Sequence, residues 1–338
     1  MQEHEHKFTT IQQVNTKSPL KPTNNMSKIL AVFGATGQQG TSVINNVLSD
    51  PELSKTYTIR ALTRNTTSPA AQALSARNIS VVEADLSNRA SLETALSGVH
   101  TVFLMTTPSF GPDAKELEVS AAKLAADVAV AQGVQYLIFS TLASVHDISG
   151  GKYTKASHFD AKAEAESYIR SLPVKSAFFL PGFFMENFHP FALAPFRSPT
   201  EADKWVITLC TSPATRIPLL AVVPDGGKFV NAILAEPEKY EGKTFVAASE
   251  LRSLEEIAAA MSKATGKNVV YEEKSAEEFG KLLPPPAADV FVETFLAFEE
   301  FGYAGLETER SVQWAVENAR GKALGLEEFL EEYPLKLE

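Results

Sequence analysis

Residues 28–180 of the chain alternate between short apolar runs and amphipathic stretches. The runs are nearly continuous in β-branched and other apolar residues, and the stretches that follow have apolar residues three and four positions apart. Continuous apolar runs are typical of parallel strands buried on both faces, and the second pattern is typical of helices packed on one side. We predict strands at 29–33, 57–62, 79–83, 101–105, 136–139 and 175–180, with helices ending near 48 and at 66–77, 91–96, 114–132 and 157–169.

This order of elements predicts βαβ units, and therefore an α/β fold: a Rossmann-type doubly wound parallel sheet with helices on both faces. After Pro181-Gly182 the pattern weakens, and residues 190–218 are Pro-rich and irregular. Ser253 and Glu256 form an S-x-x-E capping box, which predicts a helix at 254–264. The other expected elements are a helix at 227–234, strands at 244–247 and 269–272, and helices from 275 onward that are interrupted at 284–286.

We expect three regions along the chain. Residues 1–27 are polar and predict a disordered tail. Residues 28–180 predict the Rossmann-type domain. Residues 181–338 predict a smaller α+β lobe that contacts a substrate or a partner and returns some strands to the main sheet.

A glycine-rich turn directly follows the first predicted strand. Its glycines fall at Gly34, Gly37 and Gly40, before the first helix. In a dinucleotide-binding turn the first glycine permits the tight turn and the second lets backbone N–H groups approach a pyrophosphate. The third lets the helix lie close to the sheet, with its positive N-terminal end toward the phosphates. The segment predicted to bind the phosphates is Gly34, Ala35, Thr36, Gly37, Gln38, Gln39 and Gly40.

The end of the second strand indicates which dinucleotide binds. A carboxylate there would bind a free ribose 2′-hydroxyl, but no Asp or Glu occurs from 53 to 82. Arg60 and Arg64 lie in this window, and a guanidinium just past the strand can pair with a 2′-phosphate. We therefore predict NADP(H), with Arg64 as the main contact and Thr63 and Asn65 in support. The alternative is that Arg64 is an ordinary exposed arginine.

Two further strand ends are expected to face the same crevice. Asp85 and Leu86 follow the third strand and are placed to contact the adenine. Thr106 and Thr107 follow the fourth and are placed near the ribose and diphosphate. Asp85 could instead cap the next helix, because Asp is a strong capping residue.

Composition narrows the choice of partners. The 338 residues are 44% hydrophobic and carry a formal net charge of −10, which argues against direct binding to nucleic acid. No apolar run approaches the roughly 18 residues that a membrane span needs. Cys210, the one cysteine, excludes an internal disulfide and suits a reducing compartment; we interpret it as a buried small side chain rather than a reactive thiol. We expect no metal site.

Five motifs together resemble the NmrA-like family of atypical short-chain dehydrogenases/reductases. They are GATGQQG at 34–40, RALTRN at 60–65, ADLSN at 84–88, HFDAK at 158–162 and PGFFMEN at 181–187. The resemblance spans residues 28–274 and implies bound NADP(H) on a Rossmann domain with a smaller C-terminal lobe. The family includes a negative regulator of nitrogen-metabolite genes, redox-sensing relatives and reductases. The resemblance therefore implies a cytoplasmic or nuclear protein and leaves the chemistry open.

The residues expected for hydride transfer are incomplete. Short-chain dehydrogenases use Tyr-x-x-x-Lys on one helix, where the Tyr protonates the substrate and the Lys holds the ribose. None of the eight tyrosines has a Lys four positions later. As in NmrA-like proteins, His158 stands four residues before Lys162, so Lys162 is expected to hold the ribose. His158 is either a replacement proton donor or a structural residue near the cofactor. Tyr153 lies nine residues before Lys162, on the opposite face unless its segment folds back as a loop.

Two functions have direct support in the sequence, and a third, weaker option is a non-redox catalyst that keeps the cofactor as a structural part. An intact cofactor turn without Tyr-x-x-x-Lys favours a sensor, in which NADP(H) controls binding of a regulatory protein partner. The Pro- and Phe-rich segment at 181–218 favours an NADPH-dependent reductase of a small apolar acceptor such as a quinone, enone or imine. Ser140, Thr141 and Ser144 are then candidates to orient a substrate carbonyl. Phe183, with Phe184 and Phe188, either covers the nicotinamide or packs in the core.

Overall fold

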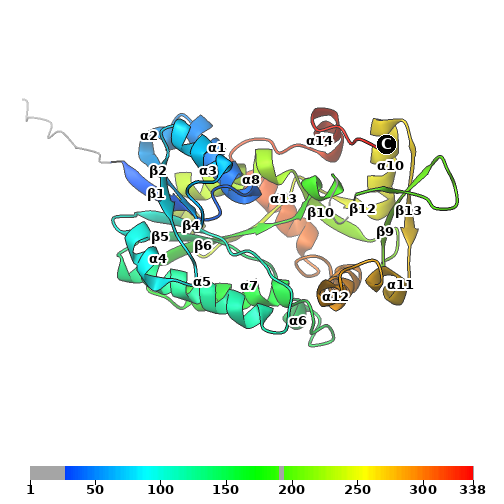
Figure 1. Ribbon diagram of the computed structural model, residues 1–338, viewed down its shortest axis with the longest axis horizontal. Coiled ribbons are helices and arrows are strands. Elements are labelled where there is room, and N and C mark those ends of the chain that lie inside the picture. The colour runs from blue at the N-terminus through cyan, green and yellow to red at the C-terminus, as the bar shows by residue number, and fades with distance from the viewer. Residues whose placement is uncertain (1–26, 190–193, 338) are drawn as a thin grey trace, which may run out of the picture.

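A seven-stranded parallel sheet forms the centre of the computed structural model, which describes residues 27–189 and 194–337 (Figure 1). Its order is β11-β6-β5-β4-β1-β2-β3, so the chain moves outward from β1 to β3 and then crosses back to β4. The register places Leu30 of β1 between Ile59 and Thr101. The crevice beyond the C-terminal ends of β1 and β4 is thus the topological switch point of the sheet, where such folds bind ligands. The tail predicted for residues 1–27 lies, apart from Ser27, outside the described residues.

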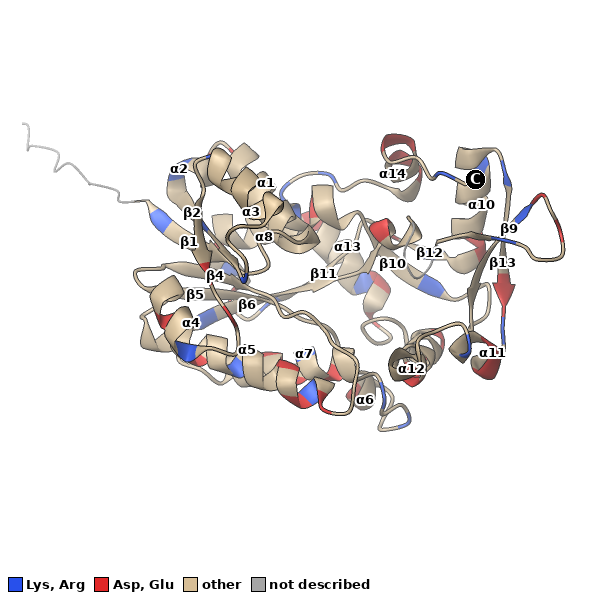
Figure 2. Ribbon diagram, in the orientation of Figure 1, with Lys and Arg blue, Asp and Glu red and all other residues tan. Residues whose placement is uncertain are grey.

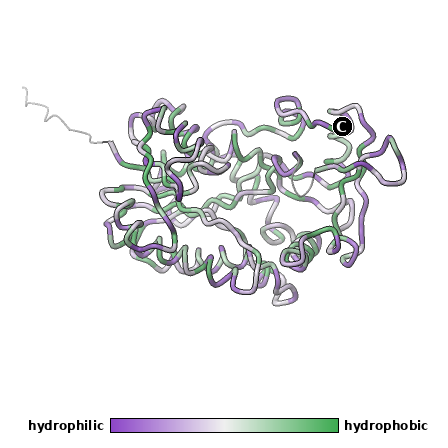
Figure 3. The backbone as a smooth tube through the Cα atoms, viewed as in Figure 1, coloured by the Kyte–Doolittle hydropathy of each residue, from purple (hydrophilic) through white to green (hydrophobic). Residues whose placement is uncertain are grey.

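The predicted α/β fold is confirmed, with element ends within a few residues of the pattern. The strands of the main sheet are β1 (Lys28–Val32), β2 (Tyr57–Thr63), β3 (Ser80–Glu83), β4 (Thr101–Leu104), β5 (Tyr136–Ser140), β6 (Lys175–Pro181) and β11 (Thr244–Ala247). The backbone tube is mainly hydrophobic along these strands (Figure 3). Both faces of the sheet are covered by helices, which explains the continuous apolar runs.

Helices cover the two faces in separate groups. On one face lie α1 (Gln38–Ser49), α2 (Leu53–Thr56), α3 (Pro69–Ala76) and α8 (Val222–Ala235), and on the other lie α4 (Arg89–Leu96), α5 (Ala114–Ala131) and α7 (Ser157–Arg170) (Figure 1). Lys, Arg, Asp and Glu mark the outer helices α4, α5 and α7 (Figure 2). No helix in the described part of the chain is long and apolar enough to cross a membrane.

The C-terminal lobe contains two small sheets, and of their strands the sequence pattern predicted only the one at 269–272. One has the order β12-β10-β7 and the other β13-β9-β8. Their strands are β7 (Phe183–Phe184), β8 (Phe196–Arg197), β9 (Lys204–Leu209), β10 (Arg216–Leu220), β12 (Glu250–Ser253) and β13 (Asn268–Glu273). The expectation of an irregular segment at 190–218 is therefore wrong for its described part. β7 and β8 have only two residues each, β10 contains Pro218, and all the pairs except β8–β9 join strands that are distant in sequence, so local pattern does not reveal the two sheets.

The helices of this lobe follow the pattern more closely. They are α9 (Pro237–Tyr240), α10 (Leu254–Thr265), α11 (Ala276–Gly280), α12 (Pro285–Phe301), α13 (Thr308–Asn318) and α14 (Leu326–Glu332), with α6 (Val145–Ile148) in the Rossmann part. The capping box of α10 is confirmed: Ser253 N–H donates to the Glu256 carboxylate at 2.8 Å, and Glu256 N–H donates to Ser253 Oγ at 3.2 Å. The helix expected at 227–234 begins earlier, at Val222, because the Glu186 carboxylate accepts from the N–H groups of Val222 and Val223.

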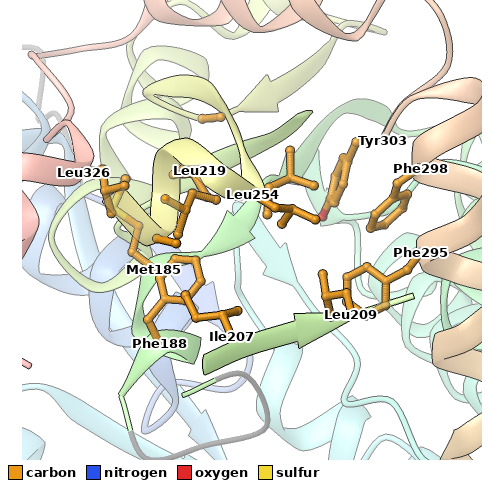
Figure 4. Packing of buried hydrophobic residues seen from close by; sticks show 14 of the residues in the cluster. Met185, Phe188, Ile207, Leu209, Leu219, Leu254, Phe295, Phe298, Tyr303 and Leu326 are labelled. Carbon is orange, nitrogen blue, oxygen red and sulfur yellow. The ribbon is translucent and has the colours of Figure 1, made fainter. Parts of the chain in front are cut away.

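An apolar core joins the small sheets to the C-terminal helices. Met185, Phe188, Leu219 and Leu254 lie in one part of it, and the rings of Phe295, Phe298 and Tyr303 gather in another (Figure 4). The Tyr303 hydroxyl donates to the Pro181 carbonyl at 2.8 Å, which ties this lobe to the end of β6. The lobe is thereby fixed next to the ends of the central strands.

Close packing between α1 and α8 depends on Gly227. Its N–H donates to Ser42 Oγ at 2.8 Å, and a Cβ built on Gly227 would lie 2.4 Å from the Ser42 carbonyl oxygen. We expect Gly227→Ala to lower the free energy of unfolding by about 1–3 kcal/mol, because the two helices must separate. Denaturant unfolding checks this, with Gly280→Ala as the control, since its nearest neighbour would be 3.7 Å away. Equal stability of the two variants would contradict the expectation.

The segment after α13 is tied to the start of α2 by a salt bridge. The Arg320 guanidinium bonds both oxygens of Asp50 and contacts Glu52 at 2.6 Å. The hydrogen bond from Arg320 lowers the pKa of Asp50 to about 2. A lowered carboxyl pKa adds stability that is present above the ordinary value, near 4, and is lost as pH falls toward 2.

We therefore expect Arg320→Ala to lower the melting temperature by an amount that is constant between pH 5 and 7 and shrinks as the pH falls through about 4 to 2. Thermal melts across this range measure it. Arg310→Ala, which removes an exposed pair with Glu307, is the control. A difference between Arg320→Ala and wild type that persists unchanged at pH 2 would count against this pair.

Candidate functional site

The glycine turn after β1 lies at the switch point of the sheet. Gly34 has a φ of +61°, a left-handed conformation that L side chains rarely adopt. A Cβ on Gly34 would lie 2.5 Å from the Met105 sulfur, so a side chain at this position has no room unless Met105 moves. The turn is anchored by Phe33 N–H, which donates to the Phe103 carbonyl, and Ala35 N–H, which donates to the Leu62 carbonyl. β1 and its two neighbours thus hold the turn in place.

The N-terminal end of α1 is free of acidic and capping side chains. Gly37 is the N-cap, no side chain caps the helix, and the first turn has no acidic residue. Thr36, Gly37 and Gln38 are exposed at this end. Gly40 lies beneath them, and a Cβ there would be 2.2 Å from the Gly34 carbonyl oxygen. An uncapped helix N-terminus at a glycine turn is a suitable site for an anionic group such as a phosphate.

The turn is also joined to the end of β5. Ser140 Oγ donates to the Gln39 side-chain oxygen at 2.7 Å, between residues that are 101 positions apart. Ser140 was a candidate to orient a substrate carbonyl, but in this structure its hydroxyl is hydrogen-bonded to the glycine turn. The next residue, Thr141, is fully buried and its hydroxyl lies 3.4 Å from the Lys162 carbonyl oxygen.

The end of β2 presents one exposed guanidinium to the same crevice. Arg64 is exposed, and within the described residues no hydrogen bond or ion pair holds its side chain. Asn65 N–H donates to Thr63 Oγ1 at 3.3 Å, which shapes this loop. Arg60, in contrast, donates to the carbonyls of Ala95 and Ser97, both at 2.8 Å, and so caps the end of α4. Of the two arginines, Arg64 is the one available to a ligand.

Asp85 does not cap the following helix, so that alternative is wrong. Its carboxylate accepts from the N–H and hydroxyl of Ser87, and Asn88 is the N-cap of α4 instead. The hydrogen bonds from Ser87 are the main reason that the pKa of Asp85 is lowered, and the charge of Arg64 adds to the effect. Asp85 and Arg64 therefore lie near one another at the ends of β3 and β2, with the half-buried Leu86 next to Asp85.

A buried cluster of three polar side chains lies below the end of β4. The Lys162 ammonium donates to Glu118 at 2.5 Å and to the hydroxyl and carbonyl of Thr106 at 2.7 and 3.0 Å. Thr106 Oγ1 in turn donates to Glu118 at 2.5 Å. The structure thus brings together the predicted Thr106 and Lys162, while Thr107 is exposed.

Glu118 is the member of this cluster that sequence reasoning missed. It lies 44 positions before Lys162, so no local motif connects the two residues. One signal was present: Glu118 falls four residues after Ala114 and four before Ala122, both on the buried face of α5. A carboxylate in that row indicates a buried partner, since unpaired charges are rarely buried.

His158 is enclosed by aromatic rings at the start of α7. Its ring lies 4.9 Å from Phe159, 5.5 Å from Phe291 and 6.1 Å from Phe110, measured between centroids. Its Nδ1 is buried and has no hydrogen-bond partner among the residues that the structure describes. Burial, with a smaller effect from the Lys162 charge, lowers the pKa of His158 to about 4, so the ring is neutral near pH 7. A neutral imidazole in this setting is a weak proton donor.

The remaining candidates lie outside this cluster. Tyr153 is in a loop before α7, and its hydroxyl donates to Glu300 at 3.1 Å rather than pointing to Lys162. Ser144 caps the short helix α6. Phe183 is half-buried and its ring lies 5.5 Å from that of Phe188.

Cys210 is 5% exposed, and burial raises the pKa of its thiol to about 11, which favours the interpretation of Cys210 as a buried small side chain. No group of His, Cys, Asp and Glu side chains suited to a metal occurs among the described residues.

Comparisons with known proteins agree on one family. The sequence profile of the NmrA-like family matches residues 26–330. The NmrA-like family domain-containing oxidoreductase ptmS of Penicillium ochrochloron is 30% identical over 317 residues, which cover 89% of this chain and 87% of that protein. The similarly described cpsB of Aspergillus campestris is 33% identical over 275 residues, or 76% and 78% of the two chains.

Solved structures show the same fold at lower identity. NmrA, a negative transcriptional regulator, matches in its complex with NAD at a TM-score of 0.75 and 22% identity, and in its complex with NADP at 0.73 and 23%. Each match covers 90% of this chain and 95% of that one. The Citrobacter triphenylmethane reductase complexed with NADP(H) matches at 0.70 and 19% identity, covering 91% and 99%. The profile match along nearly the whole chain confirms the resemblance seen in the five motifs: this protein belongs to the NmrA-like family.

Proposed function

We propose that this protein binds NADP(H) and acts as an NADP(H)-responsive regulatory protein. The observation that carries the proposal is a cradle suited to a dinucleotide, made of the glycine turn, the uncapped N-terminal end of α1 and Arg64, beside α7, where the candidate proton donors are enclosed or bonded elsewhere. His158 is neutral and enclosed, Tyr153 is bonded elsewhere, and all three protons of Lys162 are engaged. The residues of the site thus favour binding of NADP(H) over catalysis that requires a proton donor.

The residues of the cradle fit each part of the dinucleotide. The N–H groups at the start of α1 suit the diphosphate, and Arg64 suits the 2′-phosphate, because a guanidinium forms charge-assisted hydrogen bonds with phosphate. Asp85 and Leu86 flank the adenine side. Thr106, Thr107 and Lys162 lie where the ribose of the nicotinamide would bind. The bound cofactor would supply a nicotinamide able to carry hydride.

The contacts of α12 provide a route from the cofactor to a partner surface. Glu293 of α12 accepts from the N–H groups of Thr154 and Lys155 at 2.6 and 2.7 Å, just before α7. Asp289 of α12 pairs with the Lys155 ammonium at 2.7 Å. Phe291, on the same helix, contacts the His158 ring. A ligand that shifts the start of α7 would therefore also shift α12 and the C-terminal lobe.

Two measurements test this function. Calorimetric titration with NADPH and NADH should give binding with a preference for the phosphorylated form. Hydrogen exchange with and without NADPH should then show altered protection in α12 as well as in the glycine turn. Unchanged exchange in α12 at saturating NADPH would refute the regulatory role while leaving cofactor binding in place.

A second candidate is an NADPH-dependent reductase, which is favoured because the relatives ptmS and cpsB are named as oxidoreductases. The rings of Phe110 and Phe291, 5.3 Å apart beside His158, give the site an apolar side. Quinone, enone or imine acceptors need less help from a protein acid than simple ketones do. NADPH oxidation across such a panel, with Lys162→Ala as a control, tests it. Turnover that Lys162→Ala abolishes would favour the reductase, and no turnover on any acceptor would favour the sensor.

A further inference from the structure

The hydrogen bonds of Lys162 form a closed arrangement that leaves none of its protons free. An ammonium has three donors and no acceptor. The three are directed to Glu118 Oε1, Thr106 Oγ1 and the Thr106 carbonyl, and the Thr106 hydroxyl closes the ring by donating to Glu118. Thr106 is 3% exposed, and Glu118 and Lys162 are each 7% exposed.

The pair formed by Glu118 and Lys162 differs from the other polar links between α5 and α7. These two helices lie side by side below the sheet (Figure 1). Glu164 of α7 pairs with Lys115 and Lys123 of α5 at 3.6 and 3.1 Å, and its side chain is 46% exposed. Tyr168 donates to Asp127 at 2.7 Å at the outer side. The link between Glu118 and Lys162 is the buried one, and it alone among these three reaches the end of a central strand.

We propose that Glu118 is a positioning residue of the dinucleotide site: together with Thr106 it holds the Lys162 ammonium, in its charged form, at the end of β4 where the nicotinamide ribose binds. The inference rests on the proposed binding of NADP(H). The ammonium reaches the ribose by exchanging one of its bonds to Thr106, while Glu118 keeps it in place. A lysine with four rotatable side-chain bonds gains its fixed position from these two partners.

The charge of Lys162 depends on the Glu118 carboxylate. Burial lowers the pKa of Lys162, and the charge and hydrogen bond of Glu118 oppose that effect. The titratable group that acts on this ammonium is Glu118, from α5. The ammonium in turn helps to lower the pKa of His158, one turn earlier on α7. β4 contributes the uncharged Thr106, and β5 is followed by the uncharged Thr141. Without Glu118 the pKa of Lys162 falls further, so the ammonium loses its proton at a lower pH.

The test is a set of NADPH dissociation constants measured by fluorescence titration at pH 6.5 and 8.5. The variants are Glu118→Gln, Lys162→Met and the double variant, and each is compared with wild type at the same pH so that titration of the 2′-phosphate cancels. We expect Glu118→Gln to weaken binding about tenfold at pH 8.5 and clearly less at pH 6.5. In the Lys162→Met background the same change should alter the dissociation constant less than about twofold, because Glu118 acts through Lys162.

Matched variants separate positioning from helix packing. Glu164→Gln breaks a surface link between the same two helices and should leave NADPH affinity unchanged at both pH values. Glu118→Asp keeps the carboxylate and should restore a profile parallel to wild type. If Glu118→Gln does not fold, comparing Lys162→Met with the double variant still shows whether Glu118 affects affinity without Lys162, since removing both buried charges is often tolerated. A difference of more than about twofold in that comparison overturns the inference.

The possible results of this test fall into three kinds. A pH-dependent loss that disappears in the Lys162→Met background supports the inference. An equal loss at both pH values, an unchanged affinity of Glu118→Gln, or a loss that persists without Lys162 overturns it. A wild-type protein that binds neither dinucleotide contradicts the proposed function itself, which is a separate and recognisable result.

Discussion

Replacing Gly40 with alanine is expected to abolish detectable NADPH binding. The new Cβ would lie 2.2 Å from the Gly34 carbonyl oxygen and 2.7 Å from the Ala35 Cα, both of which are backbone atoms. The turn and the start of α1 must therefore move apart, and the N–H groups that would meet the diphosphate lose their alignment. A loss of at least a hundredfold in affinity is expected, since several charge-assisted hydrogen bonds of roughly 1.5–3 kcal/mol each fail together.

Calorimetry with NADPH measures the loss, and a thermal melt of each variant shows whether the fold survives. Gly280→Ala is the control, because a Cβ there meets nothing closer than 3.7 Å and lies far along the chain, at the end of α11. Binding of NADPH by Gly40→Ala with wild-type affinity would show that the glycine turn is not the diphosphate site.

Replacing Arg64 with aspartate is expected to reverse the choice of cofactor. Arg64 is exposed at the end of β2, and residues 53–82 contain no carboxylate that would repel a 2′-phosphate. The substitution exchanges a charge-assisted bond to the 2′-phosphate for a repulsion, and gives a ribose 2′-hydroxyl an acceptor. NADPH affinity should fall about tenfold to a hundredfold, while NADH affinity should hold or rise.

The measurement is the ratio of the two dissociation constants rather than either one alone. Arg89→Asp makes the same charge change in the first turn of α4, on the opposite face of the sheet, where Arg89 pairs with Glu93. Its ratio should equal that of wild type. Parallel losses of NADPH and NADH affinity in Arg64→Asp would remove the assignment of Arg64 to the 2′-phosphate.

Local pattern was sufficient for the Rossmann part because its information is local. Each strand is a continuous apolar run, and each is followed by its own helix within about twenty residues, as Tyr57–Thr63 and Pro69–Ala76 illustrate. The capping box at Ser253 works the same way, since both partners lie within one turn. In the C-terminal lobe β10 pairs with β12 and β7, and β13 pairs with β9 some 60 residues earlier. No local signal encodes such pairings.

The same distinction between local sequence signals and contacts between distant segments applies to the candidate site. The spacing of Gly34, Gly37 and Gly40 and the basic end of β2 are properties of the sequence, because the turn, the helix start and the guanidinium are each built from neighbouring residues. Only the folded chain decided that Asn88 rather than Asp85 caps α4, that Tyr153 turns away to Glu300, and that Glu118 meets Lys162. These outcomes depend on which side chains from distant segments share one buried volume, and burial sets both the charge of Lys162 and the neutrality of His158.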